Sequence, residues 1–139
     1  MQKTFEVINH TADTGIIAYG ADMKQAFANA AVALFSIIVD SDAVRENLHR
    51  DVEVSADDQE SLLVQWLNEL IYLFDVEHIV FNKFEINKLT KTQLQARCFG
   101  EKVEPSRHKL KTGVKAATYH LLKVEKNNNG YKIQVIFDI

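Results

Sequence analysis

Residues 62–75, LLVQWLNELIYLFD, carry the strongest periodic signal in the chain. Apolar side chains recur there at i, i+3, i+4 and i+7, the spacing of one face of an α-helix. Asp57 and Asp58 precede the run, and an aspartate in that place caps a helix and suits the positive end of its dipole. We therefore predict an amphipathic helix whose buried stripe consists of Leu62, Leu63, Trp66, Leu67, Leu70, Ile71 and Phe74.

A second helix is predicted upstream. Asp22 is a good N-cap, and Gln25 follows it at the spacing of a capping box. The helix is expected to run to about Val39. Its apolar stripe comprises Ala26, Phe27, Ala30, Ala31, Leu34, Phe35 and Ile38.

Short alternating or apolar runs predict strands around these helices. The runs are residues 3–8, 16–19, 52–54, 80–86, 94–99, 114–124 and 131–137. The turn residues at 127–130 predict a hairpin of the last two runs, with a helical turn near Ala116 and Ala117 as the alternative for part of 114–124. We expect an α+β fold, with two amphipathic helices packed on mainly antiparallel β-sheet in a single domain over residues 1–139.

Composition excludes several classes of protein. The 139 residues are 47% hydrophobic and 25% charged, as in ordinary globular domains and unlike disordered chains. No apolar run reaches the roughly 18 residues of a membrane span, and the first ten residues hold no apolar signal core. We therefore expect a cytoplasmic protein without a membrane partner. The one cysteine, Cys98, rules out an intrachain disulfide and predicts a small packed side chain within a strand.

Charge is unevenly distributed along the chain. Residues 1–79 hold 14 Asp and Glu against 4 Lys and Arg, a net of −10, whereas residues 80–139 hold 5 against 12, a net of +7. Such asymmetry can mark a surface that meets a charged partner, but two halves that interleave in one domain cancel, which we favour. The overall charge of −3 disfavours a generic basic nucleic-acid binder.

Two groups of carboxylates are the first candidate site. Asp13 ends a polar loop, HTAD, at residues 10–13, where it can bind a metal, act as a base or satisfy a local turn. At the other end of the chain, Asp138 and the terminal carboxylate of Ile139 place two anions together, which repel unless a cation lies between them. With Asp13 they would form an all-oxygen site suited to Ca²⁺ or Mg²⁺. From the residues alone, a local turn and a solvated tail are the favoured interpretations.

A basic segment at residues 107–115 is the second candidate. In a regular strand, alternation would place Lys109, Lys111 and Lys115 on one face that could approach phosphates or an acidic partner. A solvated strand face is the common alternative. Lys115 stands in an apolar context, VKAA, where a lysine needs a partner such as a nearby carboxylate.

Motifs of the common enzyme classes are missing from the sequence. There is no glycine-rich phosphate loop, no dinucleotide fingerprint and no Gly-x-Ser-x-Gly elbow. The five histidines are scattered without zinc-site spacing.

Four segments together resemble the archease family. They are FEVINHTADTGIIAYG at 5–20, LLVQWLNELIYLFD at 62–75, RHKLKTGVKAATYHLLKV at 107–124 and VIFDI at 135–139. The resemblance spans the chain from Phe5 to Ile139. It implies a protein that is not itself an enzyme but a cofactor of an RtcB-type tRNA-splicing ligase. Such a cofactor promotes guanylylation and multiple turnover of the ligase, which joins 2′,3′-cyclic phosphate or 3′-phosphate RNA ends to a 5′-hydroxyl.

The resemblance also implies site residues. A divalent cation, calcium first and magnesium or manganese as alternatives, would be held by Asp13, Asp138 and the terminal carboxylate of Ile139. The functional lysine of the family matches Lys115. Gly113 departs from the acidic residue of many members, and a glycine within a strand predicts a bulge or a close backbone approach before Lys115.

Other functions stay open at this point. The first alternative is a chaperone-like modulator of another RNA-modifying enzyme, such as a tRNA methyltransferase. A small metal-dependent hydrolase would use the same carboxylates, but no separate general acid or base lies at a convincing spacing. A direct RNA-binding module would rest on the basic second half, without a strong stripe of aromatic and basic residues. In the leading interpretation, RNA is reached through the ligase.

Overall fold

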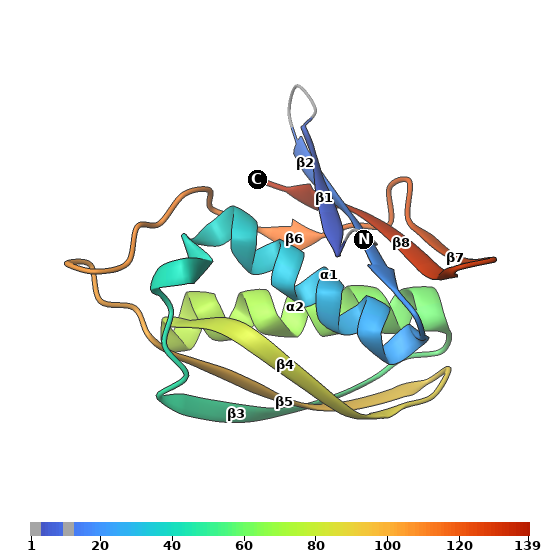
Figure 1. Cartoon of the computed structure of the whole chain (residues 1–139), viewed down its shortest axis with the longest axis horizontal. Helices are drawn as coiled ribbons and strands as arrows, with labels where there is room; N and C mark the ends of the chain where they lie inside the picture. Colours follow the sequence, from blue (N-terminus) through green and yellow to red (C-terminus); the bar gives the residue numbers. More distant parts are fainter. Residues whose placement is uncertain (1–3, 10–12) are drawn as a thin grey trace.

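Two helices lie between two antiparallel sheets in the computed structural model, which describes residues 4–9 and 13–139 (Figure 1). The first sheet has the order β1-β2-β8-β6, with β7 also paired to β8, and the second has the order β3-β5-β4. The elements are β1 (Phe5–Asn9), β2 (Asp13–Gly20), α1 (Met23–Ile38), the 3-10 helix η1 (Ser41–Ala43), β3 (Leu48–Ser55), α2 (Gln59–Glu77), β4 (Ile79–Leu89), β5 (Gln93–Lys102), β6 (Ala116–Ala117), β7 (Lys123–Asn127) and β8 (Gly130–Asp138). The predicted α+β class is confirmed, with the strands divided between a five-stranded and a three-stranded sheet.

Helix α1 is apolar almost all round because it packs against both sheets. Asp22 caps it as predicted: the Asp22 carboxylate accepts the Gln25 N–H at 2.8 Å, and the Gln25 side chain accepts the Ala21 N–H at 2.6 Å. The core positions include four alanines, whose small side chains let the sheets approach closely. Its buried residues are Ala26, Phe27, Ala30, Ala31, Ala33, Leu34, Phe35, Ile37 and Ile38.

Helix α2 buries the predicted stripe except Phe74, which is half-buried, and it also buries Val64 and Leu73. Asp58 is its N-cap and accepts the Ser61 N–H at 2.8 Å. Trp66 is fully buried, and its indole N–H donates to the Phe27 carbonyl of α1 at 3.0 Å. This bond satisfies the one polar atom of the Trp66 side chain and fastens the two helices together.

Residues 114–124 do not form the single strand expected from their pattern. Ala116 and Ala117 form the short strand β6, so the helical turn considered there is also wrong, and the chain then turns before β7. The Ala117 N–H donates to the Asn68 side chain of α2 at 2.8 Å. That bond holds the segment at the edge of β8, and Leu121, at φ 53°, turns the chain away. The predicted hairpin of β7 and β8, with its turn at residues 127–130, is confirmed.

Neither helix in the described ranges combines the length and the apolar character that crossing a lipid bilayer would require. Cys98 is fully buried in β5, as predicted, and burial raises the pKa of its thiol to about 12. A thiol with so high a pKa stays protonated and unreactive at neutral pH.

Candidate functional site

The register of the five-stranded sheet brings the predicted carboxylates together. Asp13 at the start of β2 lies directly opposite Asp138 at the end of β8. Directly opposed residues on neighbouring strands share one face of the sheet, with Cβ atoms about 4.5–5.5 Å apart. Two like charges so placed repel each other. The pair therefore favours a cation or a basic partner between or beside the two side chains.

Strand β6 brings Lys115 to the same place from the other side of β8. Ala116 pairs with Asp138, and the Lys115 N–H donates to the Asp138 carbonyl at 2.8 Å. Asp138 is thus flanked by Asp13 on one neighbouring strand and by the Lys115 backbone on the other. Ile139, the next residue, is 41% exposed. All four predicted site residues therefore meet at one end of one sheet.

One side-chain oxygen of Asp13 is buried and lacks a hydrogen-bond partner among the residues that the structure describes. Asp13 Oδ1 accepts no hydrogen bond from any residue in the described part of the chain. Leaving a buried charged oxygen unsatisfied is costly, whereas coordination to a cation would satisfy it. The all-oxygen donor set suits a hard cation such as Ca²⁺ or Mg²⁺. The residues present therefore fit the cation implied by the resemblance.

The side chains alone do not complete such a site. Within residues 4–9 and 13–139, no three His, Cys, Asp or Glu side chains are grouped closely enough to hold a metal ion. Asp13 and Asp138 supply two donors, so further oxygens must come from the carboxylate of Ile139, from main-chain carbonyls or from water. His10 and Thr11, in the predicted polar loop, lie outside the described residues.

Lys115 differs from its sequence-based expectation. Its side chain is exposed and forms no ion pair with the described residues, whereas Val114 and Ala117 occupy the buried positions beside it. The apolar context therefore reflects its neighbours, and the predicted carboxylate partner of a buried lysine is wrong. An exposed, unpaired ammonium group can instead reach a bound partner.

The basic segment is not a regular strand. Residues 103–115 run irregularly past the end of α1, so the predicted lysine face of Lys109, Lys111 and Lys115 is wrong. Lys111 binds the last turn of α1. Its backbone N–H donates to the Ile38 carbonyl at 2.8 Å, and its ammonium group donates to the Ser36 carbonyl at 2.7 Å. These bonds satisfy carbonyls that the last turn of any helix leaves free.

The space around Gly113 is unoccupied. A Cβ atom at Gly113 would meet nothing within 4 Å, and its φ lies outside the left-handed region. The expected bulge or close backbone approach is therefore wrong. The position accepts an ordinary side chain, so the departure from the family pattern does not distort the path to Lys115.

A buried charged network holds the start of this segment, and sequence reasoning missed it. Glu101 of β5 is 3% exposed and accepts hydrogen bonds from Arg107 at 2.5 and 2.9 Å and from the Arg45 N–H at 2.6 Å. His108 Nδ1 accepts the Glu104 N–H at 2.8 Å. His108 Nε2 therefore carries the proton and donates to Glu101 at 2.9 Å.

The network favours the charged form of Glu101. Hydrogen bonds from Arg107 first, and then from the Arg45 N–H and from His108, lower the pKa of Glu101 to about 2, against the opposing effect of burial. The only sequence signal was one acid followed by an Arg-His pair. Because the network is buried and fully paired, we assign it to the stability of the segment that leads to Lys115.

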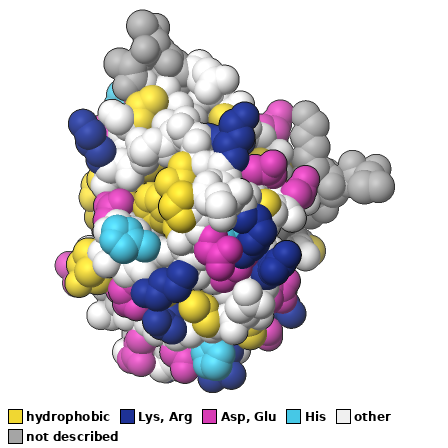
Figure 2. All heavy atoms as spheres, turned by 90° about the vertical axis from the view of Figure 1, so that its left-hand side faces the viewer, with side chains coloured by type: hydrophobic (Ala, Val, Ile, Leu, Met, Phe, Trp, Pro, Cys, Tyr) yellow, Lys and Arg dark blue, Asp and Glu magenta, His cyan; other side chains and the backbone are white. Residues whose placement is uncertain are grey.

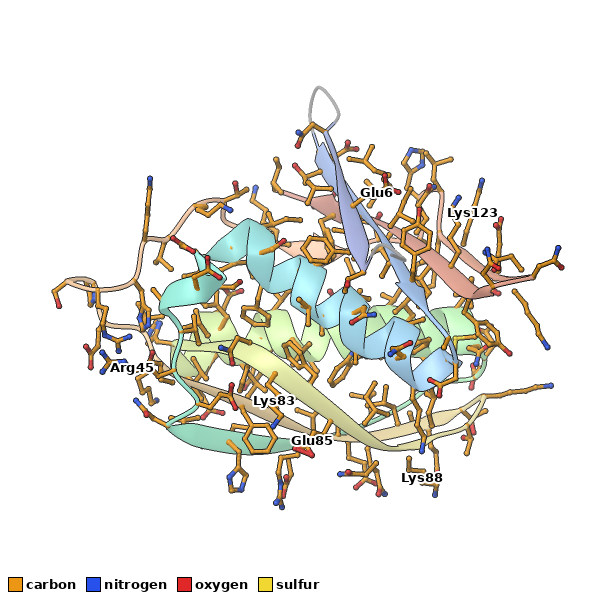
Figure 3. All side chains as sticks on the ribbon, in the orientation of Figure 1. Glu6, Arg45, Lys83, Glu85, Lys88 and Lys123 are labelled. Atoms are coloured by element: carbon orange, nitrogen blue, oxygen red, sulfur yellow. The ribbon has the colours of Figure 1, made fainter. Side chains whose placement is uncertain are left out.

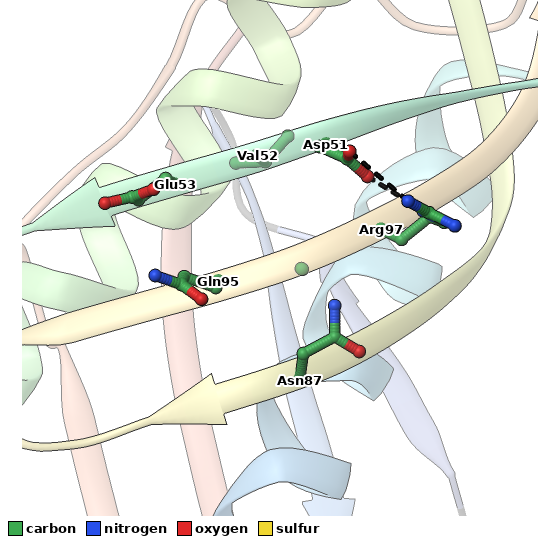
Figure 4. A pocket seen from close by; sticks show the side chains of 7 residues that line it. Asp51, Val52, Glu53, Asn87, Gln95 and Arg97 are labelled. Atoms are coloured by element: carbon green, nitrogen blue, oxygen red, sulfur yellow. Dashed lines mark hydrogen bonds and ion pairs between the residues drawn. The ribbon is translucent and has the colours of Figure 1, made fainter.

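The outer face of the three-stranded sheet carries a shallow hollow that is separate from this site (Figure 4). Arg97 crosses it to Asp51 at 2.8 Å, and Glu53, Asn87 and Gln95 complete its polar lining. Figure 2 shows that basic, acidic and histidine side chains are interspersed on the side of the molecule it presents.

Comparison with known proteins identifies the family. The model of the Archease protein family (MTH1598/TM1083) matches residues 5–139. The chain belongs to the archease family. Among curated archeases, that of Pyrococcus abyssi is 43% identical over 142 residues, covering 99% of each chain. That of Sulfurisphaera tokodaii is 41% identical over 140 residues, covering 100% of each.

Solved structures of archease proteins share the fold. The solution structure of Methanobacterium thermoautotrophicum protein 1598 superposes with a TM-score of 0.86 at 35% identity, covering 99% of this chain and all of that one. A Thermotoga maritima archease, described as a possible chaperone, superposes with a TM-score of 0.61 at 21% identity, covering 100% of this chain and 98% of that one. The arrangement of two helices between two sheets is therefore the archease fold.

Proposed function

We propose that this chain activates an RtcB-type RNA ligase in the cytoplasm, promoting the guanylylation and multiple turnover of that enzyme rather than catalysing a reaction itself. The observation that carries the proposal is the Asp13–Asp138 pair beside the exposed Lys115, with one buried Asp13 oxygen that has no hydrogen-bond partner among residues 4–9 and 13–139. Membership of the archease family supports it. RNA would be reached through the ligase.

In this proposal a divalent cation, calcium first and magnesium or manganese as alternatives, binds Asp13, Asp138 and the terminal carboxylate of Ile139. When bound, it would neutralise the repulsion between the opposed carboxylates and present a positive charge at the end of the sheet. Sheet pairing of Asp138 on both sides keeps the donor groups in place without the partner. Lys115 would then contact the ligase beside the site.

An activator acts by binding one state of its target more tightly than another. The partner state favoured here would be the conformation of the ligase that accepts the guanylate. Rigid placement of Asp13 and Asp138 on paired strands suits this role, because preorganised groups lose little freedom on binding.

The test is a ligation assay with an RtcB-type ligase, GTP, Mn²⁺ or Mg²⁺ and an RNA ending in 3′-phosphate. Wild type should stimulate repeated turnover, and Asp13→Asn and Lys115→Ala should lose most of the stimulation. Glu53→Gln is the matched control, because Glu53 is an exposed carboxylate on the other sheet. Full stimulation by a folded Asp13→Asn variant would contradict the assigned site, and no stimulation by wild type would contradict the function.

A chaperone-like modulator of another RNA-modifying enzyme, such as a tRNA methyltransferase, is the second candidate. The Thermotoga maritima relative is described as a possible chaperone. Apolar side chains are also exposed on α2, with Tyr72 at 54% and Val76 at 55%. General chaperoning would depend on such apolar surface, so Tyr72→Ser with Val76→Ser should abolish it, whereas Asp13→Asn should not.

A further inference from the structure

The stretch of chain that runs past Asp138 is basic and free of acids. Residues 105–124 contain five Lys and Arg and no Asp or Glu. Arg107 and Lys111 are bound to the body of the protein, by Glu101 and by the Ser36 carbonyl respectively. The remaining lysines are exposed and unpaired within the described residues, so the part of the stretch that flanks β8 offers free positive charge.

The loop between β6 and β7, residues 118–122, stands out from the five-stranded sheet (Figure 1). Tyr119 is 58% exposed, the largest value among the exposed large apolar side chains of the described residues, and Leu121 is 51% exposed. His120, between them, is also exposed. Apolar and aromatic side chains exposed together in one short loop favour a contact surface.

The loop is held firmly despite its exposure. The Thr118 hydroxyl donates to the Ile136 carbonyl at 2.8 Å, and the Gln134 side chain donates to the Leu121 carbonyl at 2.9 Å. Leu121 adopts φ 53°, a left-handed conformation that is unfavourable for a bulky residue. Strained conformations of this kind gather at ligand-binding sites. The rest of the loop thus presents Tyr119 and His120 outward at the cost of local strain.

Lysines stand on both sides of the loop. The Lys115 N–H is bonded to the Asp138 carbonyl, and Lys123 pairs with Gln134, four residues earlier on β8. Four residues at the antiparallel rise of about 3.4 Å per residue place these two points about 14 Å apart along the sheet. Figure 3 shows Lys123 labelled at the start of β7. Two ammonium groups that form no ion pair with the described residues therefore flank an exposed tyrosine and an exposed histidine.

We propose that this surface, formed by Lys115, Tyr119, His120 and Lys123, binds single-stranded RNA directly. Aromatic rings that project between lysines can stack bases while the lysines contact the phosphates on either side. Single-stranded RNA fits the exposed Tyr119 ring and the flanking lysines, because a ring can stack bases and lysine is a common phosphate contact. Direct RNA binding goes beyond the proposed function, in which RNA is reached through the ligase, and it does not depend on ligase activation.

Two acids lie near this surface. Glu125 lies on β7, two residues beyond Lys123, and Asp138 lies beside Lys115. Asp138 belongs to the candidate cation site, and a bound cation would remove its repulsion of phosphate. We therefore expect RNA to bind more tightly when Ca²⁺ is present.

The proposal is tested by fluorescence anisotropy with a labelled single-stranded RNA of about twelve nucleotides ending in 3′-phosphate, and with its duplex form. Wild type should bind the single strand more tightly than the duplex. Tyr119→Ala should weaken binding about tenfold, within the range for the loss of one stacked base. Tyr72→Ala is the matched control, because Tyr72 is 54% exposed but lies on α2, and it should leave binding unchanged.

The double variant Lys115→Ala with Lys123→Ala should reduce the slope of log affinity against log salt by about 1.4, since each phosphate contact on a single strand contributes about 0.7. Lys83→Ala with Lys88→Ala, on the other sheet, should not change the slope. Failure of wild type to bind RNA would overturn the proposal, as would equal effects of Tyr119→Ala and Tyr72→Ala. If Tyr119→Ala weakened binding to the ligase and left RNA binding unchanged, the surface would be a protein contact and the proposal would be wrong.

Discussion

Charged side chains on the two sheets differ in the partners that the structure gives them. On the three-stranded sheet, Arg97 pairs with Asp51 at 2.8 Å, and Lys83 lies 3.9 Å from Glu85 and 5.2 Å from the centre of the Phe99 ring. On the five-stranded sheet, Asp13 Oδ1 has no hydrogen-bond partner within the described ranges. Charges that are satisfied within the molecule gain little from a ligand, whereas unsatisfied ones favour a partner. The candidate site therefore lies at the end of β8.

The largest expected effect comes from a third group of charges, which is both buried and paired. Glu101→Gln should lower the free energy of unfolding by about 3–5 kcal/mol, because Arg107 would be left without its charged partner. Urea denaturation measures the change. Glu53→Gln, an exposed control, should change it by less than about 0.5 kcal/mol. A loss below 1 kcal/mol for Glu101→Gln would show that the network contributes little to stability.

The same network should make the stability of the protein depend on pH in acid. The pKa of Glu101 is lowered in the folded protein to about 2, from its ordinary value of 4.5. A carboxylate with a depressed pKa contributes stability above its unfolded pKa and loses that contribution as the pH falls through the folded pKa. Wild type should therefore lose stability between about pH 4.5 and pH 2. Glu101→Gln should show a smaller loss across that window when both are followed by thermal denaturation.

Stabilisation by Ca²⁺ should depend on carboxylates of the five-stranded sheet and not on those of the three-stranded sheet. At a free concentration one hundred times its dissociation constant, Ca²⁺ should raise the free energy of unfolding of wild type by about 2.7 kcal/mol. Asp13→Asn should remove this gain, because the variant lacks one of the opposed carboxylates. Asp51→Asn, on the other sheet, should keep it. Equal stabilisation of wild type and Asp13→Asn would place the bound ion elsewhere and contradict the assignment of the cation site to the five-stranded sheet.

Gly113→Ala should stabilise the protein by about 0.4–1 kcal/mol, since alanine restricts the unfolded chain and a Cβ atom has free space at this position. Stimulation of the ligase should stay unchanged. Thermal denaturation and the ligation assay check the two expectations. A destabilised Gly113→Ala protein would mean that the backbone there needs glycine.

The smallest effect is expected for the exposed ion pair. Asp51→Asn should cost less than about 1 kcal/mol, because Asp51 and Arg97 are both largely exposed and water screens their attraction. Neither ligase stimulation nor RNA binding should change. A clear loss of either activity would show that the paired charges of the three-stranded sheet also serve a partner.

Local signals predicted the parts of the fold that depend on neighbours in sequence. Asp22, Asp58, the stripe of α2 and the turn at 127–130 were all evident from spacing. The break between β6 and β7 was not, because the bond from Ala117 to Asn68 joins residues 49 positions apart. Periodicity carries no information on such a contact.

In the candidate site, too, the sequence predicted the residue types but not the contacts between distant parts of the chain. The residue types of Asp13 and Asp138 suggested an oxygen site, but only the register of β2 and β8 places them opposite each other. The apolar residues next to Lys115 in the sequence suggested a buried side chain. In the structure the segment is irregular and the Lys115 side chain is exposed to solvent. The Glu101 network had no periodic signal, since it joins a strand to two irregular segments.

The hairpin turn before β8 sets the spacing of the site. Gly130 holds φ 133°, and a Cβ atom there would come within 2.3 Å of the Gly20 carbonyl, so the start of β8 cannot slide along β2. Asp138 lies eight residues further on, an even number of steps along the strand. Loss or gain of one residue within β8 would turn Asp138 to the opposite face of the sheet and Phe137 out of the core. Related chains can therefore vary the loop at 118–122 in length, but the length of β8 should stay constant.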